Sequence, residues 1–425
     1  MKVAVVGLGF VGLATVLAFA EKGFKVAGYD NDPARMKMLR DGKLPFHEPG
    51  LDLALIRHSG HNLTLARDIA EAMENADVAF FCVGTPSSDD GAADLSILTL
   101  AVQSALRGVS KGRFCVLVVK STVPPGTTSE TVAPVLASLG WRVGEDIGLA
   151  NNPEFLREGS AWEDVFNNDR IIVGANDART AAIIEKLYLP FGAPVHIVSW
   201  NTGEFIKYMA NTLFATLISF ANDASRIAEA IGGVDIKRAF AVFHQDRRWT
   251  GNPCNVATHY VYPGCGFGGY CLPKDVSAIH AQATMRGYES PILAATLEVN
   301  RSIKEHVAGK IAARAVKGKP VGVLGLSFKP GSDDVRQSPS KDIIIKLLDR
   351  GLDVLAFDPI AADAFRNAYP SLQTNAAGPG SIAYAKSLDE VVKRADPLVI
   401  LVAWPEFRAV RDLGGRDVLD FRYMA

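Results

Sequence analysis

Three residue types that can do chemistry together fall within five positions of this chain: a thiol at Cys271, an amine at Lys274 and a carboxylate at Asp275. They follow a glycine-rich run at 264–269, where the backbone can approach a ligand closely. A thiol beside a cation is more readily held as the thiolate, which is the nucleophilic form. This spacing predicts a reactive cysteine. The alternative is that Cys271 is a small buried apolar side chain.

Length and composition limit what the rest of the chain can be. With 425 residues, 48% hydrophobic and 21% charged, it is typical of a soluble protein of two or three domains. A net charge of -1 provides no field for nucleic acid or an acidic membrane surface. There is no apolar run long enough to span a bilayer and no signal-peptide pattern at the N-terminus. The five cysteines lack metal-site spacing, so we expect no metal and a reducing cytoplasm.

The N-terminus carries a dinucleotide-binding pattern. An apolar run at 2–6 predicts a buried strand, the motif Gly-Leu-Gly-Phe-Val-Gly occupies 7–12, and an Ala-rich helical run follows. A second strand closes on Asp30, about 20 residues further on, where a carboxylate can accept a hydrogen bond from a ribose 2′-hydroxyl. An acid there repels a 2′-phosphate, which favours NAD over NADP, although Arg35 could accommodate such a phosphate.

Strand-helix alternation continues, and polar residues collect just after the apolar runs at 78–83, 114–120 and 147–150. Open α/β sheets bind ligands at the carboxyl ends of their strands, so these residues belong to a candidate site. Two further strands are expected at 170–174 and 195–198, and the first domain should end near residue 200.

From Thr202 the pattern is helical to about Ile231, where two glycines stop it. A helix of this length predicts a domain spine or a dimer interface. Lys207 and Asn211 are four residues apart and share a face, which points either at a ligand or at solvent.

A second α/β unit follows a boundary near 317–320. Strands are expected at 321–328, 352–358 and 397–403, with a helix at 338–350. Since this unit lacks the glycine motif, its main ligand should be something other than a dinucleotide.

An NAD site together with a nucleophilic thiol predicts oxidation at the aldehyde level. A thiolate adds to an aldehyde, the thiohemiacetal loses hydride to NAD, and the resulting thioester needs water and a base. Lys207 or Asn211 could stabilise the oxyanion, and Glu154 or Asp275 could act as the base.

With these motifs in this order, the chain resembles the nucleotide-sugar dehydrogenases over its whole length. It is most similar to those that act on UDP-glucose, and next to those that act on GDP-mannose. The motifs that carry the resemblance are Gly7–Gly12, Ser121–Thr127, Asn152–Gly159, Lys207 with Asn211, Gly266–Asp275, and Phe328 and Lys329 with Asp333–Arg336.

The resemblance implies that the sugar C6 alcohol is oxidised to an aldehyde and then to a carboxylate, with two NAD reduced in succession, which makes UDP-glucuronate from UDP-glucose. It implies that Cys271 is the nucleophile and that Lys207 and Asp275, with Asn211 beside them, handle protons and the oxyanion. Glu154 would activate the hydrolytic water, and Thr122 would belong to the water and proton network.

The resemblance also implies the binding residues. The cofactor positions are Gly7, Gly9, Val11, Gly12, Asp30, Arg35, Thr85, Thr122, Glu158, Lys274 and Arg336. The substrate positions are Glu154, Phe155, Leu156, Lys207, Asn211, Phe267, Gly268, Cys271, Phe328 and Lys329, and Arg247 would reach the substrate of a dimer partner.

The family's fold is α/β, with two Rossmann-like doubly wound parallel-sheet domains joined by a long central helix and a helical dimerisation domain. For this chain that predicts an NAD-binding domain at 1–200, a central domain with the cysteine loop at 201–317 and a nucleotide-sugar-binding domain at 318–425. A homodimer or an assembly of dimers is expected, with no nucleic-acid or membrane partner.

The segment 242–262 departs from the family's usual sequence after the arginine, near the expected sugar pocket. GDP-mannose or another nucleotide sugar is therefore an alternative substrate, while the stretch at 154–159 argues against N-acetylhexosamines. A two-electron dehydrogenase of the hydroxyacid type and a non-catalytic NAD-binding protein are the distant alternatives.

Overall fold

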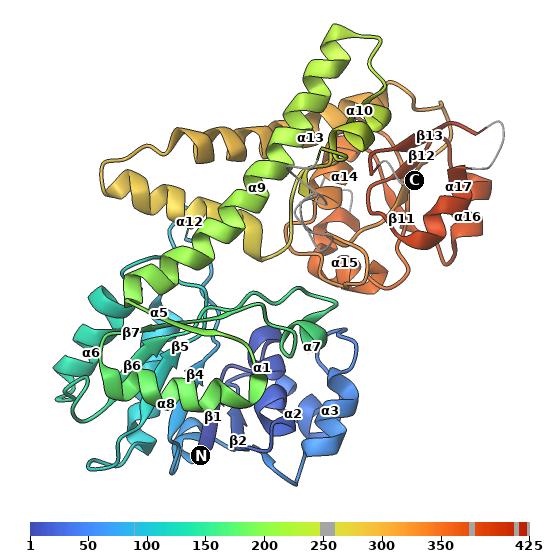
Figure 1. The fold of residues 1–425 in the computed structure, drawn as a ribbon. Coiled ribbons are helices and arrows are strands. Elements are labelled where there is room, and N and C mark those ends of the chain that lie inside the picture. The colour runs from blue at the N-terminus through green and yellow to red at the C-terminus, as the bar shows by residue number, and fades with distance from the viewer. Residues whose placement is uncertain (89, 247–259, 374–378, 412–415, 423–425) are drawn as a thin grey trace. The chain divides into compact units, whose positions relative to one another are not determined.

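The computed structural model describes residues 1–425 except 89, 247–259, 374–378, 412–415 and 423–425 (Figure 1). The chain forms two compact units, Met1–Ala210 and Asn211–Ala425, and the division falls inside one long helix. The predicted division into three domains at 200 and 317 stays a prediction.

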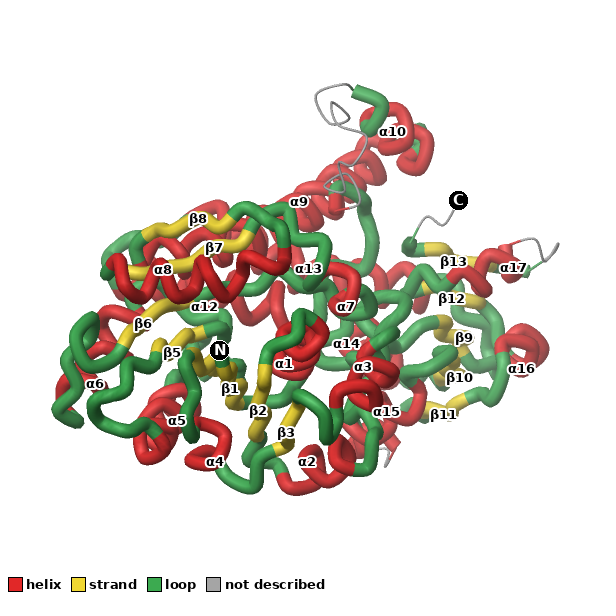
Figure 2. The backbone as a smooth tube through the Cα atoms, turned by 60° about the horizontal axis from the view of Figure 1, so that its bottom comes forward, coloured by secondary structure: helices red, strands yellow, loops and turns green. Residues whose placement is uncertain are grey.

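The first unit is built on an eight-stranded sheet with the order β3-β2-β1-β4-β5-β6-β7-β8 (Figure 2). Neighbouring strands are parallel except β6 and β7, which pair antiparallel. The connection between those two carries only the short helix α7 (Ala161–Asp164) and does not cross the sheet. The strands are β1 (Lys2–Val6), β2 (Lys25–Tyr29), β3 (Leu63–Leu65), β4 (Val78–Phe81), β5 (Val116–Val119), β6 (Gly148–Asn151), β7 (Ile171–Ala175) and β8 (Val195–Val198).

Both faces of the central strands of this sheet are buried. In β5, Val116 and Val118 belong to the apolar cluster under α1, α3 and α8, whereas Leu117 and Val119 belong to the cluster under α4, α5 and α6. Alternating side chains thus enter two cores, which is why the strands read as continuous apolar runs. The helices are α1 (Phe10–Glu21), α2 (Pro33–Arg40), α3 (Leu51–His58), α4 (Ile69–Met73), α5 (Ser96–Ala105), α6 (Ala133–Ser138) and α8 (Ala178–Tyr188), with short turns η1 (Leu106–Gly108), η2 (Thr127–Val132) and η3 (Leu189–Phe191).

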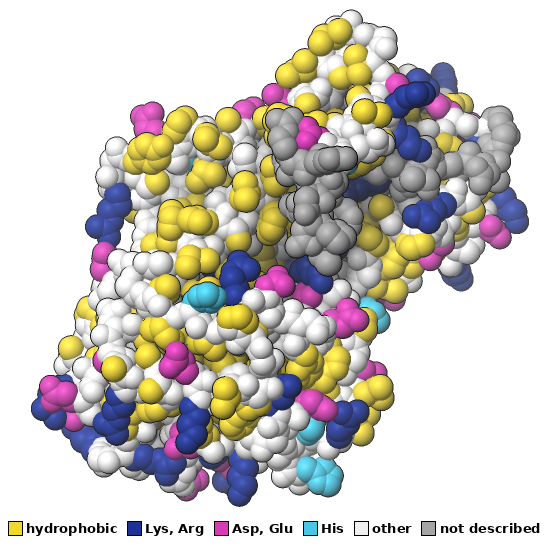
Figure 3. All heavy atoms as spheres, in the orientation of Figure 1, with side chains coloured by type: hydrophobic (Ala, Val, Ile, Leu, Met, Phe, Trp, Pro, Cys, Tyr) yellow, Lys and Arg dark blue, Asp and Glu magenta, His cyan; other side chains and the backbone are white. Residues whose placement is uncertain are grey.

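The long helix α9 (Trp200–Ile231) has 32 residues and a length of about 48 Å. It begins two residues before the predicted start and ends at Ile231, directly before Gly232 and Gly233, which both have positive φ. Large apolar side chains are exposed along it, and Figure 3 shows hydrophobic side chains at the surface over its course. They are Phe205, Met209, Leu213, Phe220, Ile227 and Ile231.

The second unit contains a five-stranded, wholly parallel sheet with the order β11-β10-β9-β12-β13 (Figure 2). Its strands are β9 (Val321–Leu324), β10 (Val354–Phe357), β11 (Ile382–Tyr384), β12 (Leu398–Ile400) and β13 (Val418–Asp420). Helices α13, α14 and α15 pack on one face, and α16 and α17 pack on the other. The helices are α10 (Ile236–Phe243), α12 (Cys271–Met285), α13 (Pro291–Ala312), α14 (Pro339–Asp349), α15 (Ala362–Ala368), α16 (Leu388–Arg394) and α17 (Arg408–Arg411), with turns η5 (Pro370–Gln373) and η6 (Pro405–Phe407).

The predicted fold class is confirmed: the chain has two Rossmann-like α/β sheets and a long central helix. The antiparallel pairing of β7 with β6 is the exception to the predicted parallel arrangement. Three strands of only three residues, β3, β11 and β13, were not predicted because so short a run shows no periodicity. Among the described helices, none has the length and apolar character that crossing a membrane requires.

Candidate active site

The glycine motif forms a tight turn between β1 and α1. Gly7 has φ +89, and a Cβ on Gly12 would lie 1.8 Å from the carbonyl oxygen of Gly7, so both positions require glycine. Gly9 differs, because a Cβ there would meet no described atom within 4 Å. Open space therefore lies in front of the backbone at the N-terminus of α1, as an incoming pyrophosphate requires.

Asp30 joins the end of β2 to this turn. Its Oδ2 accepts hydrogen bonds from Leu8 N at 2.6 Å and from Arg35 Nη1 at 2.8 Å, and its Oδ1 accepts from Asp32 N at 2.9 Å. A carboxylate with these described partners keeps acceptor capacity on Oδ1 for a ribose hydroxyl. Arg35, which could have favoured a 2′-phosphate, is ion-paired to Asp30.

The loops after β4 and β5 are held together at the same edge of the sheet. Thr85 Oγ1 donates to Thr122 O at 2.9 Å. The segment after Thr122 is held by Glu204 of α9, which accepts from Gly126 N at 2.7 Å and from Thr128 N at 2.8 Å. Burial raises the pKa of Glu204 to about 7 although these N–H groups favour its charged form. Sequence reasoning missed Glu204, because its partners lie far away in the chain.

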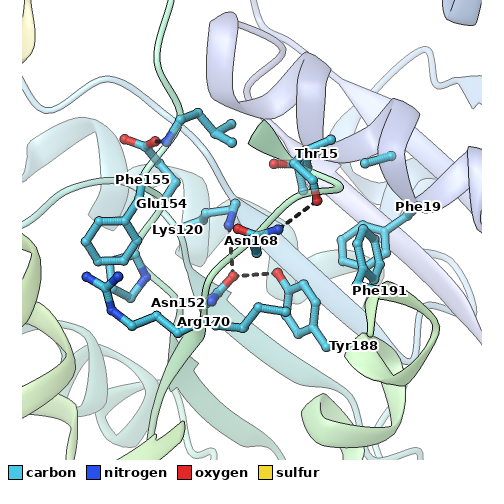
Figure 4. Close-up of a pocket in the computed structure, with 15 residues that line it drawn as sticks. Thr15, Phe19, Lys120, Asn152, Glu154, Phe155, Asn168, Arg170, Tyr188 and Phe191 are labelled. Atoms are coloured by element: carbon cyan, nitrogen blue, oxygen red, sulfur yellow. Dashed lines mark hydrogen bonds between the residues drawn. The ribbon is translucent and has the colours of Figure 1, made fainter. Parts of the chain in front are cut away.

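Glu154 and Lys207 come together beyond the end of β6. Glu154 Oε2 accepts from Leu156 N at 2.5 Å, and Glu154 Oε1 lies 3.3 Å from Lys207 Nζ. The Phe155 ring is near two cations, because Lys207 Nζ lies 5.1 Å and Arg170 Cζ lies 4.9 Å from its centroid. Figure 4 shows Arg170 beside this ring. The interpretation of Lys207 as a solvated residue is wrong, because it is only 5% exposed. Glu158 lies half-buried in the following turn.

In the second unit, Cys271 is the first residue of α12, and its side chain is exposed. The alternative of a buried apolar cysteine is therefore wrong. The positive end of a helix dipole favours a thiolate. A helix start at Cys271 was not predicted from the sequence. The other two residues of the opening motif, Lys274 and Asp275, lie on the same helix and are both buried.

Asp275 is the centre of a buried polar group. Its Oδ1 accepts from Lys274 Nζ at 2.6 Å, and its Oδ2 accepts from Asn211 Nδ2 at 2.5 Å. Asp275 is fully buried and Asn211 is 7% exposed, so a solvated Asn211 is also excluded. Three of the predicted residues thus meet within this unit. Asn211 follows Lys207 by one turn of α9, so a single helix carries residues of both clusters.

The glycine-rich loop before Cys271 is held by Asn300 of α13, another residue that sequence reasoning missed. Asn300 Oδ1 accepts from Phe267 N at 2.7 Å, and Asn300 Nδ2 donates to Phe267 O at 3.2 Å. The Phe267 ring is buried against Ala215 and Val276. That Phe267 contacts the substrate stays a prediction.

The loop after β9 packs against the cysteine loop within the second unit. A Cβ on Gly269 would lie 2.9 Å from the Phe328 ring, and a Cβ on Gly268 would lie 2.4 Å from Gln337 O, so the two loops meet where glycines allow it. Arg336 lies over the Tyr270 ring at 4.5 Å. Lys329 Nζ lies 5.5 Å from the Phe328 ring centroid. Arg247, predicted to reach a partner's substrate, lies outside the described residues.

Comparison with known proteins agrees with this arrangement. Models of the UDP-glucose/GDP-mannose dehydrogenase family match in three parts: the NAD-binding domain at 1–192, the central domain at 201–302 and the UDP-binding domain at 322–424. A UDP-glucose 6-dehydrogenase of Pseudomonas aeruginosa is 37% identical over 417 residues, which cover 96% of this chain and 89% of the relative.

Two solved structures extend the comparison. A UDP-glucose dehydrogenase from the archaeon Pyrobaculum islandicum is 37% identical and superimposes with a TM-score of 0.90, covering 100% of this chain and 94% of that one. A GDP-mannose dehydrogenase from Pseudomonas aeruginosa is 31% identical with a TM-score of 0.56, covering 100% and 97%.

The residues of the glycine turn fit NAD. The two nucleotide-binding folds, the exposed cysteine and the three family matches all indicate the same kind of enzyme. The chain belongs to the UDP-glucose/GDP-mannose dehydrogenase family, whose members are NAD-dependent nucleotide-sugar dehydrogenases.

Proposed function

We propose that this chain oxidises the C6 alcohol of UDP-glucose to the carboxylate of UDP-glucuronate, in two oxidations with one covalent thioester on Cys271. The observation that carries the proposal is the exposed thiol at the start of α12, next to the buried Lys274, Asp275 and Asn211 cluster. A two-electron dehydrogenase needs no such thiol. The choice of UDP-glucose is supported by the 37% identical UDP-glucose 6-dehydrogenase and by the structure with a TM-score of 0.90.

The first oxidation converts the alcohol to an aldehyde. The C6 hydroxyl loses its proton to the Asp275 carboxylate, which Lys274 and Asn211 hold in place. The Lys207 ammonium stabilises the developing alkoxide. The turn with Gly7, Gly9 and Gly12 and the Asp30 carboxylate would hold NAD, which would accept the hydride in each of the two oxidations.

The second oxidation passes through Cys271. Its thiolate adds to the aldehyde carbon, and Lys207 and Asn211 stabilise the oxyanion of the thiohemiacetal. Loss of hydride from C6 gives a thioester. Glu154 then takes a proton from a water molecule whose oxygen bonds to the thioester carbon, and the carbon–sulfur bond breaks to return the Cys271 thiolate.

A substrate panel with NADH stoichiometry tests this function. UDP-glucose, GDP-mannose and UDP-N-acetylglucosamine are supplied in limiting amounts with excess NAD. We expect two NADH for each UDP-glucose and much slower turnover of the other two sugars. Faster turnover of GDP-mannose would establish the alternative substrate, and turnover of none of the three would overturn the substrate claim.

The roles of the NAD contacts, of the UDP-sugar contacts and of Arg247 remain part of the proposal, as does a cytoplasmic location.

The proposed assembly is a homodimer or an assembly of dimers. Its support is the apolar stripe along α9 from Phe205 to Ile231, which has the helical spacing of a packing face (Figure 3). Light scattering tests it, because a monomer at micromolar concentration would exclude a role for Arg247 across an interface.

A further inference from the structure

The proposed mechanism leaves unused a buried amine in the first unit, Lys120. It follows β5 directly and is only 8% exposed. Its Nζ donates to Asn152 Oδ1 at 2.8 Å, and the Tyr188 hydroxyl donates to the same oxygen at 2.5 Å (Figure 4). Two donors from different elements, the end of β5 and α8, therefore hold one amide.

This amide fixes the chain where it leaves the sheet toward Glu154. Asn152 Nδ2 donates to Ile172 O at 2.7 Å, and its backbone N–H donates to Val119 O at 2.9 Å. Pro153 follows and restricts the backbone further. The next residue is Glu154, so the direction of its carboxylate depends on how firmly Asn152 is held.

Lys120 and Glu154 also line one small cavity, with a volume of about 40 Å³. Figure 4 shows Lys120, Asn152 and Glu154 around it, with Phe19, Tyr188 and Phe191 on the other side. Apolar walls of this kind weaken solvent screening, so charges along the cavity affect one another more strongly than they would in water.

Holding an amide oxygen does not require a charge, because the Tyr188 hydroxyl does it as a neutral donor. A buried ammonium is costly, and burial accordingly lowers the pKa of Lys120, while the Glu154 carboxylate opposes that change. The titratable groups that face Lys120 or share its cavity are Cys82 after β4, Glu154 after β6, Arg170 before β7, Tyr188 of α8 and Lys207 of α9. Glu154 is the carboxylate in this set, with the cations Lys120, Lys207 and Arg170 around it.

We propose that Lys120 is a positioning residue for thioester hydrolysis: it fixes Asn152 so that Glu154 points toward the reacting water, and it places a positive charge on the cavity that the Glu154 carboxylate also lines. The inference rests on the proposed function, in which Glu154 removes a proton from water while the carbon–sulfur bond to Cys271 breaks. It assigns Lys120 no contact with the substrate.

Four variants separate the hydrogen bond from the charge. Lys120→Met removes both, and Lys120→Gln can keep a donor to Asn152 without a charge. Lys120→Arg keeps a charge that persists at all accessible pH values. Tyr188→Phe is the matched control, because it removes the other donor to the same Asn152 oxygen and changes no charge at neutral pH.

The readouts are the rate of carboxylate formation from UDP-glucose between about pH 5 and 9 and the mass of the acid-quenched protein. In Lys120→Met we expect hydrolysis to slow about 10- to 100-fold, with covalent thioester accumulating while aldehyde formation is unchanged. In both uncharged variants the acidic limb of the pH profile should move up by about one unit, because losing a nearby cation makes a carboxylate easier to protonate. Tyr188→Phe should leave that limb in place.

Matching pH profiles for Lys120→Met and Tyr188→Phe, or no thioester in the quenched Lys120→Met protein, would overturn the inference. If the uncharged variants do not fold, Lys120→Arg decides, because its permanent charge should extend hydrolysis to higher pH than in the unmutated protein, and an unchanged alkaline limb would overturn the inference. The unmutated protein is measured first. Failure to give two NADH per UDP-glucose would refute the proposed function itself, and only success there makes a failed variant count against the role of Lys120.

Discussion

The two sheets of the molecule share a plan and differ where a nucleotide would bind. In both, the strand order runs third-second-first-fourth-fifth, as β3-β2-β1-β4-β5 and as β11-β10-β9-β12-β13. In both, a glycine with positive φ follows the first strand, at Gly7 and Gly325, and an aspartate follows the second, at Asp30 and Asp358. The two aspartates each accept hydrogen bonds from the backbone just after that glycine, at Leu8 and at Leu326 and Ser327.

The difference lies in what comes next. After β1, helix α1 begins at Phe10, so its N-terminus lies at the sheet edge. After β9, a loop runs to the start of α14 at Pro339. Asp358 is also saturated, since it further accepts from Ile360 N, Ala361 N and Trp404 Nε1. The aspartate after the second strand therefore keeps acceptor capacity in the first unit, at Asp30, and holds loops together in the second, at Asp358.

The largest expected effect comes from Gly12→Ala. Its Cβ would lie 1.8 Å from Gly7 O, and the backbone of a tight turn can move only by giving up the geometry that receives the pyrophosphate. We expect NAD binding to be lost and the free energy of unfolding to fall by about 3 kcal/mol. Calorimetric titration measures the affinity for NAD, and thermal denaturation measures the stability. Gly9→Ala is the control, because it should weaken NAD binding and leave stability unchanged. Normal stability and NAD affinity in Gly12→Ala would refute the geometry of the turn.

A second test concerns a titratable group of the first unit, Glu204. In the first unit Glu204 holds the loop after β5, and burial raises its pKa to about 7 from 4.5. Between these values the folded protein binds more protons than the unfolded chain, so stability falls as the pH rises through this range. Glu204 should contribute on the order of 3 kcal/mol to this fall in the free energy of unfolding. Glu204→Gln should make the free energy of unfolding less dependent on pH. Urea unfolding at pH 5 and pH 7.5 measures both. Equal pH dependence in Glu204→Gln and the unmutated protein would contradict this assignment.

The paired aspartates give a smaller and more specific test. Asp30→Asn should weaken NAD binding by about 1–3 kcal/mol, because a charged acceptor for the ribose is lost. It should also narrow the preference for NAD over NADP. Asp358→Asn should lower the free energy of unfolding by a similar amount and leave the dissociation constant for NAD unchanged. The proposed difference between the two aspartates would be refuted if Asp30→Asn and Asp358→Asn changed NAD affinity by the same amount and stability by the same amount.

The sequence predicted those features whose causes are local. The bounds of β1 and β8 were predicted to the residue, and those of α9 to within two residues, because the residue pattern and the glycines that end α9 are local features of the chain. A reactive cysteine at Cys271 could also be predicted, because the residues of its motif are contiguous in the sequence. The role of each site residue nonetheless remains a prediction.

Other features depend on long-range contacts that a linear pattern does not contain. The partners of Glu204 lie 76 to 78 residues away in the chain, Asn300 is 33 residues from Phe267, and Lys120 is 32 from Asn152. The direction of β7 depends on a connection with no crossover helix. The helix start at Cys271 had one local signal, the proline at 273 in the first turn of α12, because proline is favoured at helix N-termini.

The most direct test of the whole account is NADH stoichiometry in the Cys271→Ala variant beside the unmutated protein. With limiting UDP-glucose and excess NAD, the unmutated protein should form two NADH and one UDP-glucuronate per sugar, and Cys271→Ala should form no carboxylate. A full yield of two NADH and of UDP-glucuronate from Cys271→Ala, or a single NADH with released aldehyde from the unmutated protein, would contradict the thioester mechanism.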